Sequence, residues 1–407
     1  FFKQKTAYDI RLSLVGSEMC IRDRSVSISK AGPFFASGPI TFSELRRTFR
    51  AQSRKTTSSG SETFATDVAP ISMSELKRDT TPTSANPIVP DATENSAIGS
   101  VSDVALSQFR NSIKFYYITQ TGSDIYFDID ALTWNSNLGK TINKTMFIEG
   151  NIGSDNALTP AASFEESPAY NVLFDVIGTI KGAPGLGGGK PGNVSITGQT
   201  GGTALSIIST GGENLVVNVN SSARIYGGGG GGEKGKTGDQ GASGLCQDTE
   251  TVQNCGACPD CPDGWTSTSG CYTGNACARV RRCNWWGSCW FETTAYLRYD
   301  DCLNEYEVAG GLGGEGGDGG NGRGHGNESG SLQGDIGAQP APDNGCNSSQ
   351  GQPGETGGAG GEWALKGADT NNTGDGGAPG RAIAGTSYSV IGSISATTIK
   401  GDYPATP

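Results

Sequence analysis

Ten cysteines gathered in one part of the chain carry the clearest chemistry in the sequence. They lie between Cys246 and Cys346, and an eleventh, Cys20, stands far from them. An even number of cysteines in a short span is typical of small domains held by disulfide bonds, because such domains bury too little apolar surface to fold on a core alone. We therefore predict disulfides, in a pairing that the sequence leaves open, among Cys246, Cys255, Cys258, Cys261, Cys271, Cys277, Cys283, Cys289, Cys302 and Cys346.

Zinc is the alternative role for these thiols. The spacing Cys255-x-x-Cys258-x-x-Cys261 suits a metal-binding turn, but no second pair of cysteines with this spacing follows it. The single histidine, His325, stands downstream among glycines. Disulfides are therefore the preferred interpretation and we expect no metal site, with zinc as the competing hypothesis.

Aromatic and arginine side chains crowd residues 246–309, a segment that we call the cysteine insert. Some of these rings are expected to form its core. Trp285 and Trp286 are adjacent, however, and adjacent residues of an extended segment point to opposite faces, so at least one ring should stay exposed. Exposed tryptophan beside arginine suits the apolar face of a sugar or an anchoring site for a protein partner. The candidate receptor-binding residues are Trp265, Tyr272, Arg281, Arg282, Trp285, Trp286, Trp290 and Tyr299.

Catalysis and cofactor binding find little support in the sequence. His325 has no nucleophile and base around it, and acid pairs such as Asp128 and Asp130 are more often solvated strand residues than a general acid and base. Residues 230–237 match the pattern of a phosphate-binding loop, but the glycine-rich residues after them cannot start the helix that such a loop needs. We predict no catalytic residues, no cofactor and no enzyme.

Charge and hydropathy exclude two classes of partner. The formal net charge of −11 argues against nucleic-acid binding, because phosphate recognition draws on clustered lysine and arginine. No stretch approaches the length of a membrane span, and we expect no membrane insertion.

The 65 glycines of the chain are concentrated on both sides of the cysteine insert. In the arms, residues 227–245 and 310–380, glycine recurs at every third position over long stretches. Glycine supplies no apolar side chain, so these arms need backbone hydrogen bonds between neighbours, and a period of three is that of an extended left-handed helix. We predict a polyglycine II helix bundle within one chain. A collagen triple helix is the alternative, and it fits less well because the triplets of residues 232–243 contain no proline.

The rest of the chain is predicted to be mainly β, with short strands and few helices. Apolar and polar residues alternate over residues 114–119 and 124–130, and short strands, the first at 193–196, then follow at about ten-residue steps. The sequence of residues 176–180 is echoed at 390–394, so we expect the two segments side by side in one sheet, with the arms and the insert as a long excursion between paired strands. We assign residues 107–226 to a β-rich base and residues 381–407 to C-terminal strands.

The N-terminal quarter falls into two parts. Residues 1–24 resemble the translation of a sequencing adapter, so we treat them as non-native and leave the native start of the chain open. Residues 25–106 are rich in Ser, Thr and Pro and are predicted to be a connector. A pattern of apolar, small, apolar, Ser, Glu or Gln, apolar and basic residues recurs at 40–46, 71–77 and 104–110. Each copy predicts a short helix capped by its serine, and because none can bury its apolar face alone we interpret them as docking repeats.

Two of these features resemble one known family. The docking repeats are similar to those of virion proteins of tailed phages, and residues 221–232 through 376–384 resemble glycine-rich tail-fibre adhesins. The resemblance implies a polyglycine scaffold whose distal loops contact the host surface, at the tip of a longer fibre in the virion and outside the cell. It implies a host surface receptor and other tail-fibre or virion proteins as partners. The cysteine insert departs from the usual pattern of the family.

The predicted function is therefore that of a phage tail-fibre tip adhesin that binds a glycan or an outer-surface protein of the host. A structural filament or surface protein of a cell, with the glycine arms serving assembly, is the alternative. A polysaccharide depolymerase is a weaker one, because some phage fibres cleave polysaccharide. Disulfides do not suit assembly in a reducing cytoplasm, but they could close after lysis.

Overall fold

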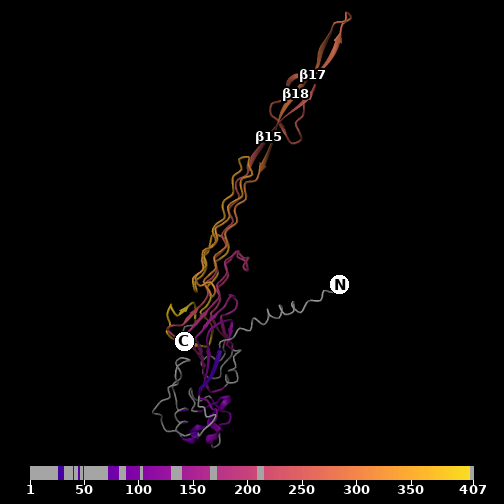
Figure 1. The fold of residues 1–407 in the computed structure, drawn as a ribbon. Coiled ribbons are helices and arrows are strands. Elements are labelled where there is room, and N and C mark those ends of the chain that lie inside the picture. Colours follow the sequence, from indigo (N-terminus) through magenta and orange to yellow (C-terminus); the bar gives the residue numbers. More distant parts are fainter. Residues whose placement is uncertain are drawn as a thin grey trace, which may run out of the picture. The chain divides into compact units, whose positions relative to one another are not determined.

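The computed structural model describes residues 26–31, 40, 45, 49, 72–81, 89–100, 104–129, 140–165, 172–208 and 215–403. The predicted adapter segment lies outside them. The chain divides into two compact units: unit 1 comprises Phe1–Lys234, Asp318–Asp335 and Gly357–Pro407, and unit 2 comprises Gly235–Gly317 and Ile336–Thr356. The described residues lie mainly in short strands, with brief helical turns, which confirms the predicted mainly β class (Figure 1).

Three sheets form the body of unit 1. The first contains β1 (Val26–Ala31), β4 (Phe115–Gln120), β7 (Asn143–Ile148), β10 (Val172–Val176), β13 (Leu215–Val219) and β20 (Ser389–Gly392). The second contains β5 (Ser123–Ile125), β8 (Asn151–Gly153), β11 (Thr179–Lys181), β14 (Arg224–Tyr226) and β21 (Ile399–Lys400). The third contains β6 (Phe127–Asp128), β9 (Ala162–Phe164), β12 (Leu205–Ile208) and β19 (Ile383–Thr386).

The chain visits these sheets in rotation, so that the body is a parallel β-solenoid of three faces. It passes β4, β5 and β6, then β7, β8 and β9, and each strand pairs in parallel with its counterpart in the next coil. Only the edge pairing of β1 with β4 is antiparallel among the pairs of these three sheets. Parallel strands stacked in this way place the same sequence position of each coil one above another.

Stacked apolar residues fill the interior of the solenoid. One ladder runs through Ile118, Met146, Phe174, Val217 and Val390, which are paired in register across the first sheet and buried. A second ladder, in the second sheet, consists of four isoleucines: Ile152, Ile180, Ile225 and Ile399. Because successive strand residues point to opposite faces, the alternation of burial in β13 follows directly from its sequence.

Val176 of the first echoed segment and residues 390–392 of the second lie in one sheet, as predicted, but not side by side, because β13 lies between β10 and β20. Residues 179–180 belong to the second sheet. Strand β10 pairs with β13, and β13 pairs with β20. The glycine arms and the cysteine insert form the connection from β14 to β19, inside the fourth coil. Shorter connections stand at the same step of the two preceding coils, between β8 and β9 and between β11 and β12.

Two strand predictions need correction. The predicted strand over residues 124–130 is broken into β5 and β6 at Tyr126, whose positive φ of 55° lets the chain turn from one sheet to the next. Residues 193–196 form no strand; Val194 there is 94 % exposed. Local alternation predicted a strand, but within the described part of the chain this segment pairs with no strand.

A run of consecutive residues, 228–233, is the centre of the glycine bundle in unit 1. Their N–H groups donate in rotation to three neighbouring segments, and their carbonyls accept in rotation from three others, so each neighbour returns every third residue. A Cβ on any of the glycines at 228–232 would overlap neighbouring backbone. The run must therefore be bare on every side, which explains its glycines. The six neighbours are residues 185–188, 199–202, 320–323, 358–361, 365–368 and 377–380.

A smaller glycine bundle lies within unit 2. Residues 235–242, 311–317 and 349–355 hydrogen-bond to one another in a closed cycle, again at every third residue. Gly238 donates to Gly314, for example, at an N···O distance of 2.9 Å. The hydrogen bonds thus follow the three-residue period of the sequence, whereas the polyglycine II helix type itself stays a prediction.

The docking repeats meet in a separate small core. Leu45, Leu76 and Phe109 occupy the same position of the repeat, and all three are fully buried in one cluster. Around them lie the short strands β2 (Arg78–Asp79) and β3 (Val89–Pro90) and the 3-10 helices η1 (Met73–Leu76), η2 (Thr93–Asn95) and η3 (Leu106–Phe109).

The serine caps predicted for these repeats are wrong where the structure describes them. The N-cap residues are Ser72 and Ala105, so Ser74 and Ser107 lie inside the helical turns. The acceptor comes from the next position of the pattern: Glu75 accepts the N–H of Ser72 at 2.7 Å, and Gln108 accepts that of Ala105 at 2.8 Å. The predicted cap Ser43 lies outside the described residues.

Candidate functional site

All ten clustered cysteines form disulfide bonds, which confirms that prediction. The pairs are Cys246–Cys346, Cys255–Cys277, Cys258–Cys271, Cys261–Cys302 and Cys283–Cys289. The three cysteines of the zinc-like motif, Cys255, Cys258 and Cys261, each have a different partner, so no pair of them faces a common centre. Over the described part of the chain, no cluster of three or more His, Cys, Asp or Glu residues could hold a metal ion.

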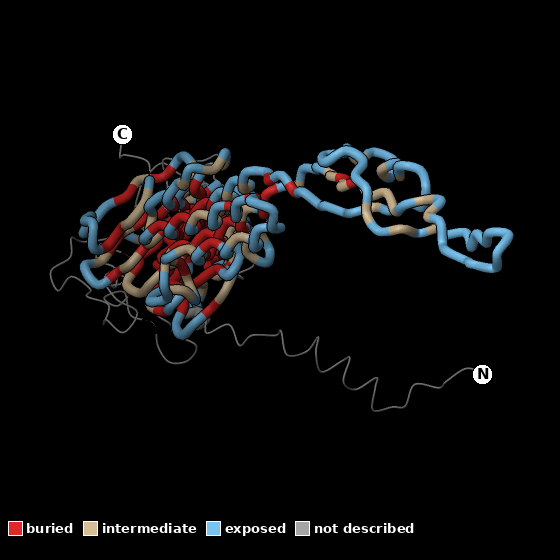
Figure 2. The backbone as a smooth tube through the Cα atoms, turned by 90° about the horizontal axis from the view of Figure 1, so that it is seen from above, coloured by how far each residue is buried: buried red, intermediate tan, exposed pale blue. Residues whose placement is uncertain are grey.

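The disulfides fasten a long antiparallel ribbon. Strand β18 (Cys289–Val308) pairs with β15 (Gly244–Cys255) through its second half and with β17 (Tyr272–Cys283) through its first half, and β16 (Thr266–Ser267) adds a short edge. Figure 2 shows most of this ribbon exposed. A two-stranded ribbon is at best marginally stable in water. Four of the five cross-links join cysteines 13 to 100 residues apart and each disfavour the unfolded chain by about 3 to 5 kcal/mol, which offsets the missing core.

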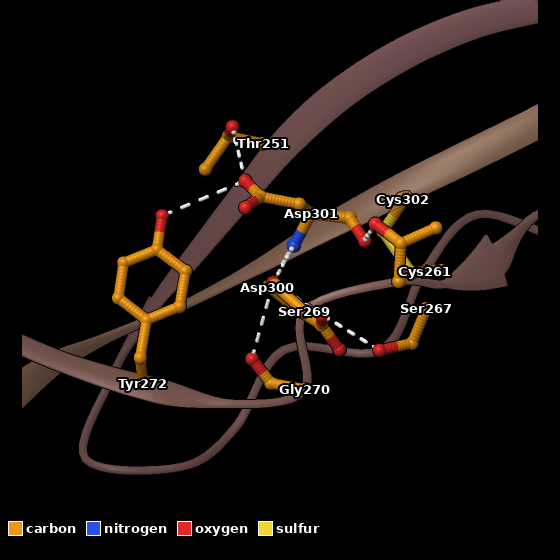
Figure 3. The surroundings of a disulfide bond; sticks show 10 residues. Thr251, Cys261, Ser267, Ser269, Gly270, Tyr272, Asp300, Asp301 and Cys302 are labelled. Atoms are coloured by element: carbon orange, nitrogen blue, oxygen red, sulfur yellow. Dashed lines mark hydrogen bonds between the residues drawn. A yellow bond between two sulfur atoms is a disulfide. The ribbon is translucent and has the colours of Figure 1, made fainter.

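One end of the β17–β18 pairing is a polar cluster beside the Cys261–Cys302 disulfide (Figure 3). Asp301 accepts hydrogen bonds from the hydroxyls of Thr251 at 2.6 Å and Tyr272 at 3.5 Å. Desolvation and, after it, the charge of Asp301 raise the pKa of Tyr272. The Tyr272 ring also stacks on Tyr299, with 5.4 Å between centroids. These two tyrosines are therefore engaged in holding the ribbon.

The other end is a turn that carries two tryptophans. The N–H of Gly287 donates to the carbonyl of Asn284 at 3.0 Å, and the N–H of Ser288 donates to Oδ1 of Asn284 at 2.9 Å. Gly287 adopts a positive φ of 81°, which closes such a turn without steric cost. Trp285 and Trp286 occupy its two central positions, where neither ring can reach a strand face, and they are 95 % and 86 % exposed.

Behind the turn, arginine and aromatic residues face each other across the strands. Arg282 pairs with Trp290, and Arg281 pairs with Phe291 in the next row. Consecutive rows alternate between the two faces of a ribbon, so each face carries one such pair. Trp290 and Phe291 are 52 % and 68 % exposed. We call residues 279–293, which comprise the turn and these rows, the tip hairpin.

The structure brings together five of the eight predicted receptor-binding residues. Arg281, Arg282, Trp285, Trp286 and Trp290 all lie in the tip hairpin. Tyr272 and Tyr299 pair at the other end of the β17–β18 ladder, and Trp265 is half-buried after the turn from Pro262.

The list of candidate receptor-binding residues did not include Phe291, Arg279 and Val280, which are also exposed in the tip hairpin. The short spacing of Cys283 and Cys289 around Asn284 and Gly287 is the signal that locates the turn. The premise that the tryptophans stand on an extended segment is wrong: they stand on a turn, and both are exposed.

No helix among the described residues is long and apolar enough to cross a membrane.

Comparison with known proteins gives one family. The family model of the phage tail fibre adhesin Gp38 matches residues 115–279. A solved structure, the crystal structure of the gp37-gp38 adhesin tip complex of the bacteriophage S16 long tail fiber, is similar with 18% sequence identity and a TM-score of 0.34, over 75% of this chain and 89% of that chain. No curated protein matches the chain. The family match confirms the resemblance to tail-fibre adhesins stated from the sequence, and with it the localisation in the tail fibre of a virion.

Proposed function

We propose that this chain, in which residues 115–279 match the phage tail fibre adhesin family, binds the surface of the host cell through its tip hairpin. The exposure of Trp285 and Trp286 is the observation that carries the proposal. Leaving two adjacent indole rings in water forgoes the free energy that would be gained by transferring their apolar surface out of water. Proteins rarely expose such a pair unless a partner covers it.

The role of each residue follows from its place in the hairpin. Trp285 and Trp286 would enter the partner as anchors, because large rigid rings gain the most contact area for the least entropy. Trp290 would extend the apolar contact along one face. Arg281 and Arg282 would supply charge and hydrogen bonds behind the rings. The role is binding rather than catalysis, because no residue of the hairpin is placed as a nucleophile or a general base.

The docking repeats provide the other half of the proposed function, which is attachment to a fibre. Three equivalent segments contribute Leu45, Leu76 and Phe109 to one buried cluster. A chain that folds three copies of one motif together suits a partner that offers equivalent surfaces repeatedly, as the subunits of a symmetric fibre do. Other tail-fibre or virion proteins are therefore the proposed partners of this region.

The test is binding of the labelled full chain to a panel of bacterial strains, compared with the double variant Trp285→Ala/Trp286→Ala. We expect binding to at least one strain and a loss of at least about 30-fold in the variant, since a hot-spot ring contributes about 2 kcal/mol or more. Tyr306→Ala, which removes a ring that is 42 % exposed in β18, is the matched control and should bind normally. Equal binding by the double variant and the native chain contradicts the proposal.

The same preparations test the two alternative functions. Release of reducing ends from capsule or lipopolysaccharide would indicate a depolymerase. Polymerisation of the isolated chain without a fibre protein would indicate a structural filament.

A further inference from the structure

Charge is divided sharply within the ribbon of unit 2. Residues 272–299 contain four arginines, Arg279, Arg281, Arg282 and Arg298, and one acid, Glu292. Glu292 forms an ion pair with Arg282 at 2.8 Å, so a phosphate bound by Arg282 would compete with this carboxylate. Residues 245–271 and 300–308 contain eight acids and no lysine or arginine. A cationic hairpin on an acidic chain is drawn toward an anionic partner, while the rest of the chain is repelled by it.

Along the tip hairpin, aromatic residues at the turn are followed by rows that contain arginines. The two most exposed rings stand at the turn, and the Arg282–Trp290 and Arg281–Phe291 rows follow the disulfide row. With a rise of about 3.4 Å per strand residue, these arginines lie about 7 to 10 Å behind the turn. Indole rings favour the region just inside the headgroups of a lipid layer, and arginines favour the phosphates outside it.

Both faces of the hairpin repeat this arrangement. One face carries Arg281 opposite Phe291, and the other carries Arg282 opposite Trp290. A single folded epitope or a sugar ring is matched by one face of a ribbon. A ribbon with an aromatic ring and an arginine on both faces suits an environment that surrounds it, in which an apolar layer lies next to a layer of anionic groups.

From these observations we infer that the tip hairpin enters the interface of an anionic, phosphate-bearing lipid layer, with Trp285 and Trp286 among the headgroups and Arg281 and Arg282 on the phosphates. This inference rests on the proposed adhesin function and names the class of partner that its site contacts first. It goes beyond the sequence-based expectation of no membrane insertion, because two rings of a turn enter the headgroup layer although no backbone crosses it.

The test is co-sedimentation of the full chain with vesicles of phosphatidylcholine alone and of phosphatidylcholine with one third phosphatidylglycerol. We expect binding to the anionic vesicles only, a blue shift of tryptophan emission, and weakening at high salt. The double variant Arg281→Gln/Arg282→Gln should bind the anionic vesicles about 30-fold more weakly, because each arginine contributes a factor of about five to the affinity. Lys236→Gln/Lys366→Gln makes the same change of net charge at half-exposed lysines of the glycine arms and should bind like the native chain. Unchanged thermal unfolding and the same number of free thiols as in the native chain show that each variant is folded.

Two results overturn the inference. The first is failure of the native chain to bind anionic vesicles while it still binds cells through Trp285 and Trp286; the partner is then a surface protein or a glycan, and the proposed function stands. The second is vesicle binding that is unaffected by Trp285→Ala/Trp286→Ala. If the native chain binds neither vesicles nor any cell, the proposed function fails as well.

Discussion

Cys283 and Cys289 face each other in the last residue pair of the β17–β18 hairpin, with their Cα atoms 4.1 Å apart, and their disulfide closes the turn that holds Trp285 and Trp286. The two rings are thus fixed at the turn by a covalent bond rather than by packing. A partner that binds them meets a turn whose backbone is already ordered.

Opening this disulfide should weaken binding while the chain stays folded. In Cys283→Ser/Cys289→Ser the turn regains freedom, and ordering its backbone again on binding should lower cell-surface affinity about tenfold. The measurement is cell binding together with thermal unfolding of the full chain. Cys258→Ser/Cys271→Ser removes a different disulfide of the insert, keeps the turn closed and serves as the control. Undiminished binding by the first variant would show that the closed turn is not needed.

Gly230→Ala should destabilise unit 1 by about 3 kcal/mol or more, because the new Cβ would overlap the backbone of residues 377–378 and the central run has no room to shift. Thermal unfolding of the full chain measures the change. Leu365→Ala is the control: its carbonyl accepts the N–H of Gly230, but its side chain is 58 % exposed, so unfolding should change little. A Gly230→Ala chain with the native unfolding temperature would refute the central position of this run.

Because of Lys144, the free energy of unfolding of unit 1 should increase as the pH rises above neutral. Burial lowers the pKa of Lys144 from 10.5 to about 7. Between about pH 7 and pH 10.5 the unfolded chain binds a proton that the folded chain does not, so the free energy of unfolding increases with pH through this window. Urea unfolding at several pH values measures this slope.

Lys144→Met should raise the stability at pH 7 and flatten that slope. The native ammonium donates hydrogen bonds to the carbonyls of Lys140 and Ile142, both at 2.9 Å, and these offset only part of its desolvation. Lys236→Met, at a half-exposed lysine, should keep the native slope and corrects for the other groups that titrate above pH 7. Identical slopes in Lys144→Met and the native chain would argue against a neutral lysine.

Glu233→Gln should loosen residues 369–375. The buried Glu233 carboxylate accepts the N–H of Thr370 at 2.5 Å and that of Gly374 at 2.7 Å. A glutamine offers one carbonyl oxygen and turns its NH2 group toward the other N–H, which costs about 1 to 3 kcal/mol. Limited proteolysis should cleave this loop faster in Glu233→Gln than in Glu315→Gln, an exposed position with the same change of charge. Equal cleavage rates in the two variants would mean that Glu233 does not hold the loop.

The sequence supports predictions wherever a local pattern is decisive. Ten clustered cysteines predict disulfides, and the spacing of glycine predicts the period of the backbone hydrogen bonds. The match between residues 176–180 and 390–394 predicts a shared sheet, although the two segments are offset by two residues, because Val390 aligns with Phe174 and Gly392 with Val176.

The three-sided solenoid itself could not be predicted, because its strands are two to six residues long and pair with partners tens of residues away. The second sheet is recognised only in the structure, where Ile152, Ile180, Ile225 and Ile399 stack on one another. The site shows the same limit. Exposure of Trp285 and Trp286 depends on the turn between Asn284 and Gly287, and an extended segment with the same residues would hide one ring.

The long connection from β14 to β19 has an evolutionary consequence. The paired residues of β12 with β19 and of β13 with β20 do not include any residue from 227–382. Recombination that replaces this connection would leave these strand pairings of the solenoid in place. If the tip hairpin binds the host as proposed, such an exchange would replace the binding surface in a single genetic event.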